Sequence, residues 1–244
     1  MSVIDKFFKF KTNAEDFCTA VIVAAGNSQR MGRDKIMMQL GDRPVIAHTL
    51  AAFQNSEHID EIIVVTKYER LQEIADICHD YKIEKASRIV LGGKSRAESA
   101  LLGVLQADEK ATLIAIHDGA RPFASPALID RTVNSAKSNH AVAPAVYATD
   151  TVRIVNAKGV AVSTPDRNTV ALIQTPQVFD AGIIKNALTK AVEKSLPVTD
   201  DCSAVEATGV KVTIVAGEQT NVKLTSSTDV YLAEKILADR GAGK

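Results

Sequence analysis

The chain has 244 residues, of which 46% are hydrophobic and 24% charged, and its formal net charge is zero. This composition is typical of a globular protein, and it lacks the basic excess that general nucleic-acid binders usually show. No apolar run approaches the roughly 18 residues of a transmembrane helix, and residues 1–19 lack the apolar core of a signal peptide. The three cysteines show neither zinc-site spacing nor a disulfide framework. We therefore expect a cytoplasmic protein that binds neither membranes nor nucleic acid.

The first predicted element is a short apolar strand that leads into a loop of small and basic residues. The strand covers Ala20–Ala25, and Gly26 is followed by Arg30, Arg33 and Lys35. A run of this kind is typical of a strand buried on both faces. Backbone N–H groups near Gly26 could approach phosphates closely, because glycine has no Cβ. The spacing fits neither the dinucleotide fingerprint nor the P-loop, and solvated surface cations remain an equal alternative.

Downstream, apolar periodicity alternates between strand and helix. Strands are expected at 61–66, 88–91, 112–116 and 211–215, and helices at 45–53, 68–80, 95–106, 183–192, 203–208 and 228–239. Repeated strand–helix units of this length predict a Rossmann-like α/β fold, with a mostly parallel sheet and helices on both faces. Ligands of such sheets bind outside the carboxyl ends of the strands, so we expect the site in the loops that follow the strands.

The loop after the strand at 112–116 carries the most informative polar residues. Asp118 is placed to bind a divalent cation, because a carboxylate together with nucleotide phosphates is the usual Mg²⁺ arrangement. A helix cap or a turn residue is the alternative for Asp118. Gly119 permits a tight turn. His117 is more simply explained as a strand-end histidine that fills a polar gap, and we assign it no catalytic role.

The second half of the chain contains a hairpin pattern inside the α/β alternation. Two alternating segments, 151–155 and 160–163, flank the turn sequence at 156–159. A lone hairpin is only marginally stable in water, so this one should pack against something. A second subunit is favoured, and a hairpin folded back on its own domain is the alternative.

Two acidic residues precede a predicted helix in this half. Asp200 and Asp201 are either first-turn helix residues or ligands, and the sequence leaves both possibilities open. Ser203 and Glu206 have the spacing of a capping box, which places a helix start at Ser203.

A resemblance to a known family is carried by six motifs. They are GGKSRAES at 92–99, HDGARP at 117–122, TPDR at 164–167, QTPQVF at 174–179, TDD at 199–201 and NVKLT at 221–225. Together with the opening loop, these motifs resemble the 2-C-methyl-D-erythritol 4-phosphate cytidylyltransferases of the non-mevalonate isoprenoid pathway. The resemblance covers about Ala20–Ala238. It implies an extension at 1–19 and one nucleotidyltransferase domain at 20–240, whose residues 148–168 form an arm for homodimerisation.

The same resemblance implies a reaction and a set of site residues. The enzyme would join CTP to the polyol phosphate with Mg²⁺ or another divalent cation and release pyrophosphate. Arg30 and Lys35 match the pair that stabilises the transition state, and Arg167 and Lys223 match the pair that positions the acceptor. Asp118 matches the acid near the metal. The implied substrate-binding residues are Ala25, Gly26, Gly92, Gly93, Ser99, Gly119, Arg121, Thr151 and Thr175.

Two departures and two alternatives accompany this interpretation. Ser95 stands where the family often has an acid, and the gap from Arg30 to Lys35 is shorter than in many members, with Asp34 in place of proline. Ribitol 5-phosphate cytidylyltransferase shares the fold, but the pair of Asp166 and Arg167 favours the methylerythritol enzyme. A non-catalytic nucleotide-binding module is disfavoured, because simple binding does not need cations around the α-phosphate.

Overall fold

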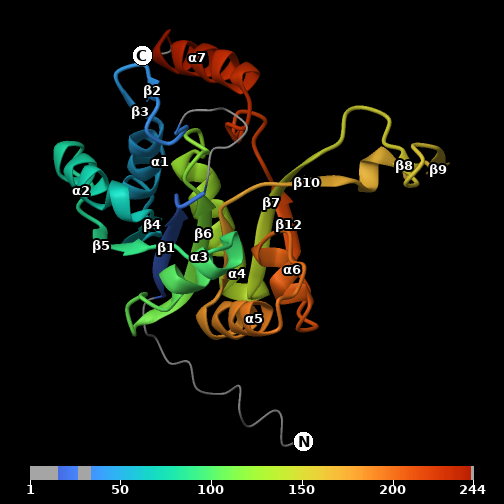
Figure 1. Ribbon diagram of the computed structural model, residues 1–244, viewed down its shortest axis with the longest axis horizontal. Coiled ribbons are helices and arrows are strands. Elements are labelled where there is room, and N and C mark those ends of the chain that lie inside the picture. Colours follow the sequence, from blue (N-terminus) through green and yellow to red (C-terminus); the bar gives the residue numbers. More distant parts are fainter. Residues whose placement is uncertain (1–15, 27–33, 243–244) are drawn as a thin grey trace, which may run out of the picture.

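A computed structural model describes residues 16–26 and 34–242 of the chain. Its centre is one eight-stranded sheet (Figure 1). The strands are β1 (Phe17–Val23), β4 (Glu61–Thr66), β5 (Ala86–Leu91), β6 (Ala111–Asp118), β7 (Ala141–Tyr147), β10 (Ala171–Ile173), β11 (Gln177–Asp180) and β12 (Thr213–Ala216). Their order is β10-β7-β11-β6-β1-β4-β5, and β12 also pairs with β7. Only the ladders of β10 and β11 are antiparallel, so the predicted mostly parallel sheet is confirmed.

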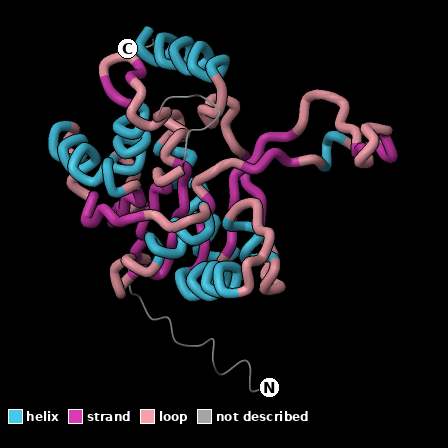
Figure 2. The backbone as a smooth tube through the Cα atoms, viewed as in Figure 1, coloured by secondary structure: helices cyan, strands magenta, loops and turns pink. Residues whose placement is uncertain are grey.

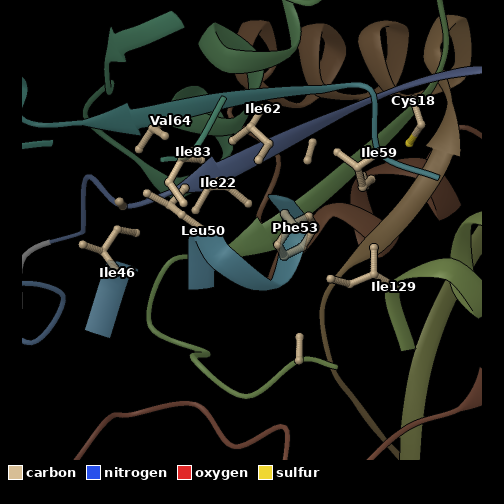
Figure 3. Packing of buried hydrophobic residues seen from close by; sticks show 14 of the residues in the cluster. Cys18, Ile22, Ile46, Leu50, Phe53, Ile59, Ile62, Val64, Ile83 and Ile129 are labelled. Carbon is tan, nitrogen blue, oxygen red and sulfur yellow. The ribbon is translucent and has the colours of Figure 1, made fainter. Parts of the chain in front are cut away.

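Helices cover both faces of this sheet, as expected. The first face is covered by α1 (Val45–Gln54), α2 (Leu71–Asp80) and α4 (Pro126–Asn139), and the second by α3 (Arg96–Val104), α5 (Ala181–Glu193) and α6 (Asp201–Glu206). Successive side chains of a strand point to opposite faces, so Ile22 of β1 joins one core and Val21 joins the other. Figure 3 shows Ile22 packed near Leu50 and Phe53 of α1.

Four further elements lie at the edges of these layers. They are β2 (Gln39–Leu40), β3 (Arg43–Pro44), the 3₁₀ turn η2 (Tyr68–Arg70) and α7 (Ser227–Ala242). Ala233 and Ile236 of α7 pack against a small third core that includes Leu40 and Phe123. None of the helices in the described ranges has both the length and the apolar content needed to cross a membrane.

Strand β1 begins earlier than the sequence predicts. It starts at Phe17, so residues 17–19 of the expected extension belong to the central sheet. Cys18 and Thr19 are buried there, and the Thr19 hydroxyl donates a hydrogen bond of 2.7 Å to the Glu61 carboxylate. The polar Thr19 interrupts the apolar pattern, but this buried partner satisfies it. Residues 1–15 of the expected extension lie outside the described residues.

The start of α6 corrects the predicted capping box. The helix begins at Asp201 with Asp200 as its N-cap, so Ser203 is its third residue and not its start. The Asp200 carboxylate accepts the Ser203 N–H at 2.9 Å, and the Ser203 hydroxyl oxygen accepts the Asp200 N–H at 3.1 Å. The box is therefore present, but three residues earlier, and both acids belong to the helix start.

The predicted hairpin projects from the sheet between β7 and β10 (Figure 1). It contains β8 (Ile154–Val155), β9 (Ala161–Ser163) and the 3₁₀ turn η3 (Arg167–Thr169). The Asn156 side chain accepts the N–H groups of Lys158 and Val160, and Gly159 has φ of +76°, a conformation that glycine adopts without strain. Figure 2 shows that most of this projection is loop. We call residues 148–168 the arm.

Candidate active site

A cavity of about 280 Å³ lies at the carboxyl edge of the sheet. The loops that follow β1, β5 and β6 meet there, together with the segment before α7. The lining residues are Val23, Ala24, Ala25, Gly26, Lys35, Ile36, Gly93, Lys94, Ser95, Arg96, Ser99, Asp118, Ala120 and Lys223. The cavity therefore gathers seven of the fourteen sequence-predicted site residues, including Lys35, Asp118 and Lys223, from segments far apart in the chain.

The carboxylate of Asp118 is surrounded by three cationic side chains. The Lys223 ammonium lies 2.8 Å from Oδ2, the Arg96 Nε lies 3.3 Å from Oδ1, and the Arg121 Nε lies 3.6 Å from Oδ2. Burial raises the pKa of the Asp118 carboxyl, but the charges of Arg96, Lys223 and Arg121 outweigh burial and hold that pKa well below its usual range. Asp118 is therefore ionised throughout the neutral pH range and presents a carboxylate to the cavity.

Arg96 joins Asp118 to a second carboxylate that the sequence reasoning left unassigned. Its Nη1 and Nη2 atoms bind both oxygens of Asp201 at 3.0 and 2.8 Å. Asp201 is fully buried, which raises the pKa of its carboxyl against the opposing charge of Arg96. Burial would lower the pKa of Arg96, but Asp201 and Asp118 raise it. The signal for Arg96 is present in the sequence, because it directly follows the glycine-containing loop after β5, as the first residue of α3.

Beneath Asp118, His117 is fixed as a neutral imidazole. Its Nε2 lies 3.2 Å from the Arg121 carbonyl oxygen, which can only accept, so Nε2 carries the proton. The Thr175 hydroxyl then donates to Nδ1 at 3.0 Å and accepts the Asp118 N–H at 3.2 Å. Burial lowers the pKa of His117 to about 4. The Phe53 ring packs against the imidazole, 4.8 Å away between ring centroids.

This arrangement places Thr175 and His117 under the site and outside the cavity lining. Thr175 is buried, and its hydroxyl positions the backbone of Asp118. His117 fills a polar gap, as the sequence predicts. Gly119 also supports the strand end from outside the lining, because its N–H donates to the Val23 carbonyl oxygen at 2.9 Å.

The glycine pair after β5 brings two loops into close contact. A Cβ on Gly92 would lie 2.3 Å from the Cβ of Ala25, so only glycine permits this approach. The Ser99 hydroxyl oxygen accepts a hydrogen bond from the Gly93 N–H at 3.0 Å. The same hydroxyl donates to the Ser95 carbonyl oxygen at 2.8 Å. Ser95 is the N-cap of α3. Ser99 therefore fixes the loop that lines the cavity.

Lys223 and Arg121 are held by the segment that precedes α7. The Leu224 N–H donates to the Ala120 carbonyl oxygen at 2.9 Å, and the Arg121 guanidinium donates to the Asn221 carbonyl oxygen at 2.7 Å. The buried Asn221 side chain donates to the Thr175 carbonyl oxygen at 2.9 Å. Burial lowers the pKa of Arg121, which lies behind Asp118 and outside the cavity lining.

Lys35 reaches the cavity from a turn that is anchored on both sides. The Asp34 carboxylate accepts from the Arg70 guanidinium at 3.1 Å, and the Ile36 carbonyl oxygen accepts the Ile46 N–H at 2.9 Å. Asp34, which stands where the sequence resemblance leads us to expect proline, is therefore half of an ion pair. Arg30 lies outside the described residues.

Comparison with known proteins connects this geometry to one family. The model of the family IspD, 2-C-methyl-D-erythritol 4-phosphate cytidylyltransferase, matches residues 18–239. The protein of that name from Halalkalibacterium halodurans is 38% identical over 224 residues, which cover 91% of this chain and 97% of the relative. The one from Rubrobacter xylanophilus is 39% identical over 223 residues and covers 91% and 95%. The chain belongs to the 2-C-methyl-D-erythritol 4-phosphate cytidylyltransferase family.

Solved structures lead to the same family. The crystal structure of 4-diphosphocytidyl-2C-methyl-D-erythritol synthase from Anaerococcus prevotii superimposes with a TM-score of 0.83 at 34% identity. The match covers 91% of this chain and 96% of that chain. The Thermus thermophilus cytidylyltransferase matches with a TM-score of 0.73 at 28% identity, over 89% of this chain and 98% of the other.

Two residues that the sequence resemblance assigns to the acceptor site lie away from the cavity of their own chain. Arg167 and Thr151 are exposed on the arm, and neither lines the cavity. The Arg167 guanidinium donates to the Thr149 carbonyl oxygen at 2.9 Å, within the arm itself. Figure 1 shows the arm extending away from β1, β6 and α3. One chain therefore does not bring together all the residues that the sequence assigns to the site.

Proposed function

We propose that this protein transfers the cytidylyl group of CTP to 2-C-methyl-D-erythritol 4-phosphate and releases pyrophosphate. The product is 4-diphosphocytidyl-2-C-methyl-D-erythritol. Family membership over residues 18–239 supports this assignment. The observation that carries it is the cavity in which an ionised carboxylate, Asp118, meets Lys35, Arg96 and Lys223 beside two glycine-containing loops.

The lining suggests how the nucleotide lies. The loop after β5 lines the cavity with Gly93, whose N–H donates to the Ser99 hydroxyl oxygen, and we propose that this loop holds the cytosine and ribose. Lys35 and Lys223 lie on other segments of the lining, where they suit the triphosphate. Ala25 and Gly26 line the cavity, and within the part of the chain that the structure describes no atom lies within 4 Å of a Cβ placed on Gly26, which suits a closely approaching phosphate.

We propose that Asp118 binds Mg²⁺, or another divalent cation, together with the nucleotide phosphates. Within the described ranges no group of three or more His, Cys, Asp or Glu residues could form a cage made of protein ligands alone. Mg²⁺ does not need such a cage, because it is usually held by one or two carboxylates plus substrate phosphates. The ionised Asp118 in the cavity lining fits that role. When bound, the cation would neutralise phosphate charge during transfer.

The chemistry requires positioning and charge stabilisation. A phosphate oxygen of the acceptor forms a bond to the α-phosphorus of CTP in line with the bond to the bridging oxygen. That second bond breaks, and its electron pair leaves with pyrophosphate. No covalent enzyme intermediate is required, since the acceptor phosphate is already a nucleophile. Lys35 and Arg30 would stabilise the charge that develops on the α-phosphoryl oxygens, and Lys223 would orient the acceptor.

We propose that the functional unit is a homodimer in which each arm completes the partner's site. Four apolar arm residues are about half exposed or more: Ile154, Val155, Val160 and Val162. Exposed apolar surface of this kind marks an interaction site, and a two-fold pairing would cover both arms at once. In that pairing Arg167 and Thr151 would contact the acceptor in the other subunit.

A pyrophosphate-release assay tests the proposed activity. The purified chain is incubated with Mg²⁺, each of the four ribonucleoside triphosphates, and either 2-C-methyl-D-erythritol 4-phosphate or ribitol 5-phosphate. We expect rapid release only with CTP and the methylerythritol phosphate. Faster release with ribitol 5-phosphate would overturn the assigned acceptor. Nucleotide binding without release for any pair would identify a binding module instead.

A further inference from the structure

Arg96 lies between two carboxylates and contacts them unequally. Two of its nitrogen atoms bind both oxygens of Asp201, at 3.0 and 2.8 Å. Only Nε contacts Asp118, and that distance is longer, at 3.3 Å. A planar guanidinium binds a carboxylate best through two parallel hydrogen bonds, and Arg96 makes that pair with Asp201 alone.

Asp201 is held so that it cannot follow the Arg96 side chain. It is completely buried in the first turn of α6. Gln177 of β11 connects the start of α6 to the sheet through hydrogen bonds of both its amide nitrogen and its amide oxygen. Its Nε2 donates to the Asp200 carboxylate at 2.8 Å, and its Oε1 accepts the Cys202 N–H at 3.0 Å. The backbone of Arg96 is fixed as well, because it follows the N-cap Ser95 at the start of α3.

The position of Arg96 matters because cations compete at Asp118. Lys223 and Arg121 already contact its Oδ2 atom. A divalent cation at Asp118 needs one carboxylate oxygen with an approach from the cavity. Among the described residues, Oδ1 has only the 3.3 Å contact with the Arg96 Nε. If Arg96 instead formed its two parallel hydrogen bonds with Asp118, both oxygens would be bound closely by positive charge, and a metal ion would have to displace the guanidinium.

We propose that Asp201 is a positioning residue that holds Arg96 away from full pairing with Asp118 and so keeps Asp118 able to bind the divalent cation that accompanies the nucleotide. This inference rests on the cation role proposed for Asp118 above. Asp201 acts through Arg96, so its effect should vanish when Arg96 is absent. A merely structural role, or direct repulsion across the site, would not have this dependence.

The experiment measures how much the metal ion strengthens nucleotide binding in the full-length protein. Calorimetric titrations give the Kd of CTP with excess EDTA and the Kd of the Mn²⁺ complex of CTP, without acceptor and hence without turnover. We divide the Kd measured with EDTA by the Kd of the Mn²⁺ complex, so a larger ratio means that the metal ion strengthens binding more. The ratio isolates the metal contribution, because a changed contact between Arg96 and phosphate affects both titrations. The variants are Asp201→Asn, Arg96→Gln, their combination and Asp118→Asn. Asp200→Asn is the matched control, since it changes the neighbouring carboxylate but keeps a residue that caps helices well.

In Asp201→Asn we expect the ratio to fall about tenfold, within the range of coupling seen for residues in one network. Arg96→Gln should leave the ratio at or above the wild-type value, and adding Asp201→Asn to it should cause no further fall. Asp200→Asn should retain the wild-type ratio. An unchanged ratio in Asp201→Asn, or an equal fall in both backgrounds, would overturn the proposal.

Two further outcomes separate this proposal from its premise. If Asp118→Asn leaves the ratio unchanged, Asp118 does not bind the cation, and the proposed metal site fails together with the role of Asp201. If Asp118→Asn reduces the ratio to about one but Asp201→Asn does not lower the ratio, only the role of Asp201 fails. Thermal melts accompany each titration. If Asp201→Asn does not fold, Arg96→Gln decides, because a lowered ratio there contradicts competition between Arg96 and the metal ion.

Discussion

The cavity and the arm hold their functional side chains in opposite ways. In the cavity, Asp118 is contacted by side chains from three separate segments, and its backbone N–H is bound by the buried Thr175. In the arm, Arg167 is exposed, and among the described residues its side chain hydrogen-bonds only to the carbonyl oxygen of Thr149, a residue of the same arm.

This difference indicates which functions one chain could perform alone and which would require a second chain. Charged side chains that are buried and held by hydrogen bonds and ion pairs are preorganised before a substrate binds, which is the condition for electrostatic catalysis. Exposed residues on a projection with apolar side chains are organised only when something covers them. In the proposed dimer, the cavity would bind the nucleotide within one subunit, and the arm would contribute residues to the site of the other.

The largest expected effect on turnover tests the cavity. Lys35→Ala and Arg30→Ala should each lower kcat about a hundredfold or more, because each removes a charge proposed to stabilise the transition state. Lys110→Ala, an exposed lysine at the opposite edge of the sheet, is the matched control. Turnover and thermal melts are measured on the same samples. The expected loss is about a hundredfold, so turnover within roughly threefold of wild type for both site variants would contradict their proposed role.

The sequence predicts the layers of the fold better than their edges. The strand at 61–66 has the predicted bounds, because its β-branched run is buried on both faces. Strand β7 was not predicted, since Pro144 interrupts its apolar run and proline usually excludes a central strand. Strands β10 and β11 are three and four residues long, too short to show a period. Only tertiary pairing defines elements of that kind.

The site shows the same division between local and long-range information. Spacing places Asp118 at a strand end and Gly93 in a loop, because each follows a strand that is visible in the pattern. The pair of Arg96 and Asp201 joins residues 105 positions apart, and no local pattern encodes it. The sequence left Asp201 open between helix residue and ligand, and its buried partner became visible only in three dimensions.

A smaller effect is expected at the carboxylate of the cavity. Asp118→Asn should raise the Mg²⁺ concentration for half-maximal rate about tenfold, since it removes the one ionised oxygen ligand proposed for the metal ion. The rate is measured across a Mg²⁺ titration at saturating CTP. An unchanged Mg²⁺ dependence would leave Asp118 as a structural residue of the strand end.

The next prediction concerns the arm and tests whether Arg167 acts in its own subunit or in the partner's. Lys35→Ala and Arg167→Ala should each be nearly inactive as homodimers. When the two variants exchange subunits, each mixed dimer contains one site with both residues intact, if Arg167 acts in the partner's site. Random mixing should then restore about a quarter of the wild-type sites.

Subunit exchange in that experiment is confirmed with two affinity tags before activity is measured. If Arg167 acted within its own chain, every site would lack one residue and mixing would restore nothing. That outcome would leave the chemistry of the cavity intact and would reassign the arm to its own subunit. A single-subunit mass in solution would refute the dimer itself.

The smallest expected effect on turnover concerns His117, which lies under the cavity but is assigned no part in catalysis. Its pKa in the folded protein is lowered to about 4 by burial, against about 6.5 for an ordinary histidine. Between these two values the unfolded chain binds the extra proton and the folded chain does not. The free energy of unfolding should therefore fall as pH drops from about 6.5 towards 4, by up to about 3 kcal/mol.

Urea denaturation of wild type and His117→Asn across that pH window measures this effect. The variant is expected to be less stable at every pH, because it loses the contacts with Thr175 and the Arg121 carbonyl oxygen. Its stability should nevertheless change less with pH than that of wild type, since the buried imidazole is gone. Parallel pH profiles would show that His117 does not carry the shift. Above pH 7 the imidazole is already neutral, so its titration should contribute no inflection to the pH profile of turnover, in contrast to its effect on stability in acid.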